Sequence, residues 1–146
     1  MLVKYWMSTK VITVDQDLSL MRASRLMKEN GIKKIAIMSG TTGFGDQGRK
    51  QLKAHADMYG ITIVADETYA PQDTDMTSQL TKIRGTDAEA IVNWSIVPAQ
   101  ALIAQQMTQV GLEAQLYQSH GYGNIKYAQE GGEAANGTIF PAGALL

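Results

Sequence analysis

Cysteine is absent from the 146 residues of this chain. Its absence excludes disulfide bonds, thiolate metal sites and cysteine nucleophiles, although it leaves the cellular compartment open. No apolar run approaches the roughly 20 residues that a helix needs to span a bilayer. Residues 1–8 also lack the basic stretch followed by a long apolar stretch that a secretory signal needs. From these absences we expect a cytoplasmic location for the chain as it is written.

Charge is scarce as well. Charged residues make up 18% of the chain and the formal net charge is −1, and Lys and Arg do not gather into one block. A general attraction to nucleic acid or to an anionic membrane is therefore excluded, and neither is predicted as a partner. The apolar content of 45% is typical of a soluble globular domain. The length suits one domain with a substantial core, so we predict a single domain over residues 1–146.

Motifs of catalysis and of metal binding are missing too. The chain has no Gly-x-Ser-x-Gly elbow for a nucleophilic serine. Its two histidines, His55 and His120, lack the spaced partners that a zinc site requires. Asp73 and Asp75 form a loop pair that is better explained as helix caps. We therefore predict no enzymatic activity, no catalytic residue, no metal and no cofactor.

What the sequence does contain is an alternation of short β-branched runs with segments of helical period. The runs are Lys10–Val14, Lys34–Met38, Ile61–Asp66, Ala90–Trp94, Gln115–Gln118 and Thr138–Phe140. From the second run onward they recur about every 25 residues, the length of one strand–loop–helix–loop unit. This pattern favours a parallel sheet covered by helices on both faces. We predict an α/β fold: a three-layer flavodoxin-like (Rossmann-like) domain with a mainly parallel sheet of five or six strands.

Helix start and stop signals divide the intervening segments. Five helices are expected, at about residues 17–30, 46–59, 75–85, 98–111 and 124–130. Glycines follow or close the first four, and Pro98 stands in a first turn, where its missing N–H is tolerated. The apolar stripes expected to face the core are Leu20, Ala23 and Met27; Leu52, Ala56 and Tyr59; Met76, Leu80 and Ile83; and Ile103, Met107 and Val110.

The glycine-rich loop Ser39–Asp46 lies between a strand and a helix. Glycines in such a loop let backbone N–H groups approach a ligand, and a helix N-terminus favours an anion. The loop lacks the Gly-Lys-Ser/Thr of a Walker A motif, and its glycine spacing differs from the dinucleotide-binding fingerprint. Two interpretations remain open: a ligand-binding loop, or a tight turn whose hydroxyl groups cap the helix.

Further candidate residues follow the other strands. Because ligands of open parallel sheets bind beyond the carboxyl ends of the strands, we consider Trp94-Ser95 and Ser119–Gly123 together, with Glu67–Tyr69 at the same edge. His120 could donate a hydrogen bond or meet a carboxylate, or be an ordinary surface residue. Trp94 could line an apolar pocket or cover the end of the sheet.

Several stretches over residues 33–140 follow one another in an order that resembles the second lobe of type I periplasmic solute-binding proteins of the leucine/isoleucine/valine-binding class. They are Lys34–Met38, Phe44-Gly45-Asp46-Gln47-Gly48, Asp73–Leu80, Thr86-Asp87-Ala88, Pro98, Val110-Gly111-Leu112 with Gln115, and Ala134-Ala135-Asn136-Gly137. The resemblance implies the strand order 2-1-3-4-5, counted from the Lys34 strand. It also implies a ligand held between two lobes and contacted by loops at the strand ends.

By position, the resemblance implies ligand contacts at Phe44, Trp94, Ser95, Ile96, His120 and Gly121. Two of them depart from the family pattern. His120 stands where the family often has an acidic residue for the ammonium group of an amino acid, and Phe44 replaces a frequent tyrosine. We therefore expect an aromatic or aliphatic carboxylate to suit this site better than an α-amino acid.

The first 32 residues resemble a different family. Val11-Ile12-Thr13-Val14, the apolar helix pattern that follows it and Asn30-Gly31-Ile32 are similar to the opening strand and helix of a cystathionine-β-synthase-type (CBS) domain. The later Gly-x-x-Thr/Ser-x-x-Asp stretch of that family is missing. The resemblance thus implies a shared fold element, and it suggests a natural or engineered chimera.

Three functions follow as hypotheses. The first is a non-enzymatic lobe with at best half of a ligand site for an amino acid or a small carboxylate. The second is a chimeric scaffold without biochemical function, and the third is a CBS-type module that senses adenine nucleotides. An open sheet edge or ligand face would also allow a homodimer.

Overall fold

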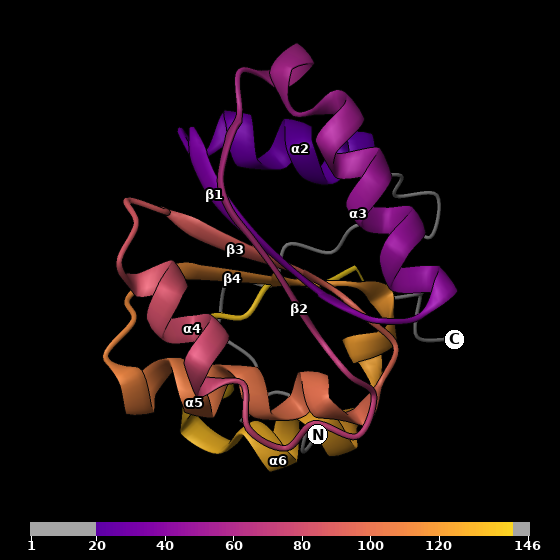
Figure 1. Ribbon diagram of the computed structural model, residues 1–146, viewed down its shortest axis with the longest axis vertical. Coiled ribbons are helices and arrows are strands. Elements are labelled where there is room, and N and C mark those ends of the chain that lie inside the picture. Colours follow the sequence, from indigo (N-terminus) through magenta and orange to yellow (C-terminus); the bar gives the residue numbers. More distant parts are fainter. Residues whose placement is uncertain (1–19, 142–146) are drawn as a thin grey trace, which may run out of the picture.

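The computed structural model describes residues 20–141, which form a parallel sheet between two layers of helices (Figure 1). The strands are β1 (Lys34–Gly40), β2 (Thr62–Tyr69), β3 (Ala90–Trp94) and β4 (Gln115–Gln118). The α-helices are α2 (Leu20–Glu29), α3 (Gly43–His55), α4 (Thr77–Arg84), α5 (Ile103–Val110) and α6 (Ile125–Gly131). Short 3-10 helices are η1 (Asp57–Tyr59), η2 (Pro98–Leu102), η3 (His120–Gly123) and η4 (Gly132–Ala135).

The sheet confirms the predicted strand order and corrects the predicted strand number. Its four strands are parallel in the order β2-β1-β3-β4, and Ile139 forms a parallel bridge with Tyr117 of β4. Within the described residues the sheet therefore has four strands rather than five or six. The run Thr138–Phe140 contributes only that bridge, because it is confined between Gly137 in a left-handed turn and Pro141, which has no N–H to donate. The run Lys10–Val14 lies outside the described residues.

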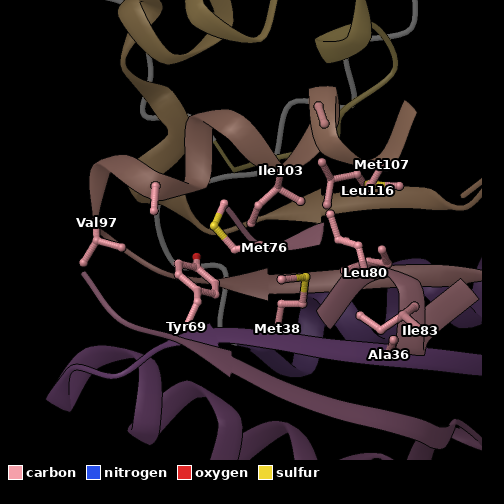
Figure 2. Close-up of a cluster of buried hydrophobic side chains, with 13 residues drawn as sticks. Ala36, Met38, Tyr69, Met76, Leu80, Ile83, Val97, Ile103, Met107 and Leu116 are labelled. Carbon is pink, nitrogen blue, oxygen red and sulfur yellow. The ribbon is translucent and has the colours of Figure 1, made fainter. Parts of the chain in front are cut away.

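Two apolar cores form because successive side chains of β1 point to opposite faces of the sheet. Ile35 and Ile37 pack toward α2 and α3, whereas Ala36 and Met38 pack toward α4 and α5. All four are fully buried, as expected for a strand covered on both faces. Figure 2 shows the second core, in which α4 contributes Leu80 and Ile83 and α5 contributes Ile103 and Met107.

The predicted inward-facing residues whose side chains are described lie in or against these cores, whereas the side chains of Leu20 and Ala23 lie outside the described part of the structure. Some helix boundaries differ from the prediction. Helix α3 begins at Gly43 rather than Asp46, because the Thr42 side chain accepts a hydrogen bond from the Gly45 N–H at 3.1 Å and caps the helix three residues earlier. Pro98 opens a 3-10 turn rather than an α-helix. The predicted stops at Gly60 and Gly111 are confirmed, and both adopt a left-handed φ that glycine accepts without strain.

Asp66 of β2 joins the edge strand of the sheet to α3. Its carboxylate accepts hydrogen bonds from Arg49 Nε at 2.5 Å and Arg49 Nη2 at 2.8 Å, and it also pairs with Lys53. Burial opposes ionisation of this carboxyl, but the hydrogen bonds from Arg49 and Lys53 outweigh burial and lower its pKa. The charged form of Asp66 therefore stabilises the folded chain.

We expect Asp66→Asn to lower the free energy of unfolding by about 1–3 kcal/mol at neutral pH, because it leaves two cations without their partner. A carboxyl with a lowered folded pKa contributes stability above its unfolded pKa of about 3.9 and loses it as pH falls through the folded pKa. The deficit of the variant should therefore shrink below about pH 4. Urea unfolding across this range measures it.

Asp87→Asn is the matched control, because Asp87 pairs with Lys34 on the exposed surface, where an ion pair contributes little. A deficit for Asp66→Asn that is the same at neutral and acidic pH would contradict the prediction.

Candidate functional site

The six predicted contact residues meet at one edge of the sheet, where the carboxyl ends of the parallel strands lie. Phe44 stands in the first turn of α3, directly after β1. Trp94 ends β3, and Ser95 and Ile96 continue the turn toward η2. His120 and Gly121 open η3, two residues beyond the end of β4.

Three of these residues form an aromatic cluster, Phe44, Trp94 and His120. The Phe44 and Trp94 rings are stacked, with centroids 5.7 Å apart and an angle of 14° between their planes. The His120 ring meets Phe44 edge-on at 5.3 Å and 88°. Phe44 and Trp94 are half-buried and His120 is exposed, so the cluster presents ring surface to the outside of the sheet edge. Offset-stacked and edge-on rings attract one another beyond simple burial of area.

Two glycines allow α3 to approach this edge closely. A Cβ on Gly48 would stand 1.9 Å from the Trp94 ring, and a Cβ on Gly45 would stand 2.0 Å from the Gly40 carbonyl oxygen. No side chain fits at either distance, so both positions need glycine for space rather than for backbone conformation. The stretch Phe44-Gly45-Asp46-Gln47-Gly48 is thus a packing motif that places Phe44 against Trp94.

The loop Ser39–Asp46 is confirmed as a tight turn that caps a helix, through the Thr42 side chain. The Thr41 N–H donates to the Tyr69 carbonyl oxygen at 2.9 Å, so the loop is also tied to β2. A direct contact of this loop with a ligand stays a prediction. The prediction that Asp73 and Asp75 cap a helix holds only in part. The Asp75 carboxylate accepts from the Thr77 N–H at 2.9 Å at the start of α4, but the N-cap residue of that helix is Met76, and Asp73 accepts from the Ala70 N–H at 2.7 Å within the loop.

The turn after β3 is held by buried serines. Ser95 Oγ accepts from the Val97 N–H at 3.2 Å, and the Ser119 hydroxyl accepts from the Ser95 N–H at 3.3 Å while donating to the Ser95 carbonyl. Gly121 approaches this turn so closely that a Cβ there would stand 3.0 Å from the Ser95 carbonyl oxygen. Ser95 therefore shapes the turn, whereas Ile96 keeps 48% of its surface exposed and is available for contact.

A chain of buried polar side chains behind the cluster was not foreseen from the sequence. The Tyr69 hydroxyl donates to Asn93 Oδ1 at 2.8 Å, Asn93 Nδ2 donates to Gln118 Oε1 at 2.6 Å, and Gln118 Nε2 donates to the Gln100 carbonyl oxygen at 3.1 Å. Burial raises the pKa of Tyr69 to about 12, so its hydroxyl stays a neutral donor. The signal in the sequence is a polar residue near the end of each apolar strand, Asn93 in β3 and Gln118 in β4. We call these four residues the polar chain.

The comparisons with known proteins identify relatives of most of the chain. The sequence profile of the periplasmic binding protein family matches residues 9–145. A Leu/Ile/Val-binding protein homologue of Brucella melitensis is 27% identical over 118 residues, which are 81% of this chain and 32% of the relative. The Leu/Ile/Val-binding protein BraC3 of Rhizobium johnstonii is 26% identical over the same shares of the two chains.

Solved structures show the same relationship. An extracellular ligand-binding receptor from Rhodopseudomonas palustris HaA2 matches with a TM-score of 0.78 and 27% identity, over 82% of this chain and 34% of the receptor. The branched-chain amino acid transporter substrate-binding protein LivJ from Streptococcus pneumoniae, solved with isoleucine, matches with a TM-score of 0.72 and 25% identity, over 81% and 34%. The chain thus spans about a third of the length of these relatives.

The comparisons give no support to a CBS segment or to a chimera. The family profile begins at residue 9 and so includes most of residues 1–32, the segment compared above with a CBS domain. Within residues 20–141, no helix is long and apolar enough to cross a membrane. In the same part of the chain, no group of three or more His, Cys, Asp or Glu side chains is arranged to hold a metal ion.

Proposed function

The chain belongs to the periplasmic binding protein family, and on that premise we propose that it is a ligand-binding lobe whose ligand lies against the aromatic cluster. The observation that supports this proposal is the convergence of Phe44, Trp94 and His120 at the carboxyl edge of the sheet. A non-enzymatic function follows from the family, whose curated relatives are named for binding leucine, isoleucine and valine. We also propose that residues 1–146 form one domain and that the whole protein acts in the periplasm.

A single lobe supplies only half of such a site. The aromatic cluster is open on its outer side, and closure of a partner lobe over it would bury a ligand that one lobe leaves half in water. Each tenfold loss of affinity corresponds to about 1.4 kcal/mol, so the loss of one set of contacts moves binding toward the millimolar range. We therefore propose weak binding by the isolated chain.

We propose a small carboxylate with an aromatic or aliphatic body as the ligand class. None of the six contact residues carries a carboxylate that could accept from an ammonium group. The exposed His120 ring can donate a hydrogen bond to a ligand carboxylate. Phe44, Trp94 and Ile96 together offer ring and aliphatic surface to the rest of the ligand.

Thermal melting in the presence of millimolar ligand tests the proposal, because a ligand that binds only the folded chain raises the melting temperature. The panel contains benzoate, an aliphatic carboxylate, leucine and AMP. We expect a carboxylate to raise Tm and Phe44→Ala to abolish the shift. Met58→Ala is the matched control, since Met58 is a large exposed apolar residue on η1.

The other members of the panel test the alternatives. A shift by leucine alone would replace the carboxylate with an α-amino acid, and a shift by AMP would support a nucleotide-binding module. A cooperative melt with no shift for any compound would contradict a surviving half-site and favour a scaffold without ligand. Light scattering on the same samples gives the mass in solution, which tests the homodimer that stays a prediction.

A further inference from the structure

The side chain of Gln100 is a buried amide without a protein partner. Gln100 is fully buried, yet neither its Nε2 nor its Oε1 has a hydrogen-bond partner among residues 20–141. Buried polar groups in folded proteins are nearly always hydrogen-bonded, because an unpaired one has given up its bonds to water without replacement. An amide with both ends unpaired therefore calls for a partner that is not one of the described side chains.

The main chain of Gln100 is already engaged. Its carbonyl oxygen accepts from Gln118 Nε2 and forms the last link of the polar chain, and its N–H donates to the Val97 carbonyl at 3.1 Å. Gln100 is thus held in place on η2 from both sides of its backbone. The side chain starts at this fixed point and brings a donor and an acceptor into the interior.

A second unpaired group lies in the same part of the fold. The Tyr122 hydroxyl is buried and has no hydrogen-bond partner within the described part of the chain. The Tyr122 hydroxyl and η2 both lie close to Gly131 of α6. A Cβ on Gly131 would stand 3.4 Å from Tyr122 Oη and 3.6 Å from the carbonyl oxygen of Ala101, the neighbour of Gln100. Helix α6 packs against both η2 and η3, so the two unpaired side chains come from segments that meet there.

We propose that an ordered internal water molecule is bound at this junction by the Gln100 amide and the Tyr122 hydroxyl. A water has two donors and two acceptor positions, so it can accept from Nε2 or donate to Oε1 of Gln100 and bond Tyr122 Oη with a remaining position. Such waters typically make about three hydrogen bonds to buried polar groups that otherwise have none.

The water extends the polar chain from η2 to η3. Helix η2 follows the turn that carries Trp94 and Ile96, and η3 opens with His120. The bound water therefore cross-links the two segments that carry most of the candidate site. Its presence does not depend on the identity of the ligand, nor on whether a ligand binds at all.

A crystal structure of the chain, at a resolution that shows ordered solvent, tests the proposal directly. We expect a water oxygen at about 2.7–3.2 Å from an amide atom of Gln100 and from Tyr122 Oη. No solvent at the junction would overturn the proposal. A Gln100 amide hydrogen-bonded to a protein group instead of solvent would overturn it too.

The sign of a stability change provides a second test. Gln100→Met keeps the length of the side chain and removes its polar atoms. If the water is bound, the variant loses its hydrogen bonds and leaves Tyr122 unpaired, so Tm falls by a few degrees relative to the parent chain. If the amide is simply unpaired, its removal raises Tm, which would count against the water.

Gln109→Met is the matched control, the same change at an exposed position of α5, and we expect no shift in Tm. Should Gln100→Met fail to fold, Tyr122→Phe removes a single hydroxyl from the same junction and provides the same sign test. We expect a fall in Tm for Tyr122→Phe as well, and a rise would overturn the proposal. Neither result affects the proposed ligand-binding function, which the melting experiments with the ligand panel test separately.

Discussion

Gly45→Ala is expected to destabilise the chain by about 3 kcal/mol, a large part of the 5–15 kcal/mol that holds an ordinary domain folded. In a helix, alanine is favoured over glycine by about 1 kcal/mol, so propensity alone predicts the opposite sign. A steric clash outweighs helix propensity and sets the sign of the stability change, because the new Cβ would stand 2.0 Å from the Gly40 carbonyl oxygen and 3.0 Å from the Gly40 carbonyl carbon. Both atoms belong to the backbone at the end of β1, which cannot move without disturbing the pairing of that strand with β2 and β3.

Gly43→Ala is the matched control for this prediction. Gly43 stands in the same first turn of α3, but among residues 20–141 no atom other than the adjoining backbone lies within 4 Å of the position that its Cβ would occupy. We expect Gly43→Ala to be neutral or to stabilise the chain by up to about 1 kcal/mol. Chemical denaturation of both variants gives the comparison. Equal stabilities for the two variants would show that α3 does not approach β1 as closely as described.

His120→Glu is expected to reverse the ligand preference of the chain. The variant replaces a donor beside Phe44 with a carboxylate, which accepts from the ammonium group of an α-amino acid and repels a ligand carboxylate. We expect the stabilisation by a small carboxylate to be lost and stabilisation by leucine to appear. A change of tenfold in either affinity, about 1.4 kcal/mol, is within reach of titration calorimetry at millimolar ligand.

His55→Glu controls for the change of net charge. His55 ends α3, at the end of the helix away from Phe44, and its ring bonds only the Gln51 carbonyl among the described residues. This variant should keep the ligand preference of the parent chain. If His120→Glu leaves the order of ligand affinities unchanged, His120 does not face the ligand, and the proposed carboxylate specificity is wrong.

Local patterns were enough to predict the alternation of strands and helices. The β-branched runs at Lys34–Met38, Ala90–Trp94 and Gln115–Gln118 are strands, and the glycines at 60 and 111 end the helical segments before the following strands. The parallel arrangement followed from the spacing of the runs, and their order followed from the family resemblance. Helix starts were less accurate, because capping by Thr42 depends on one hydrogen bond that the periodicity of apolar residues does not contain.

The location of the candidate site could be predicted from the sequence, but the relative positions of its side chains could not. The family resemblance and the carboxyl-edge rule indicated Phe44, Trp94 and His120, which are distant in sequence. That Phe44 stacks on Trp94 and meets His120 edge-on could not be deduced from their positions along the chain. The polar chain was missed because Asn93 and Gln118 look like ordinary polar residues at strand ends until the register of β3 and β4 pairs them.

By itself, the sequence determined which segments are strands and helices, which of their faces are apolar, and where glycine interrupts them, because these properties depend on neighbours within a few residues. Only the tertiary structure decided why positions 45 and 48 require glycine and why the amide of Gln100 lacks a protein partner. The space for a Cβ at Gly48 is set by a ring from another strand, and the unpaired amide of Gln100 is defined by everything that packs around it. Contacts of this kind depend on how the sheet and the helix layers pack against one another. Because protein interiors are packed as densely as organic crystals, a change of side-chain size at such a buried position affects its neighbours.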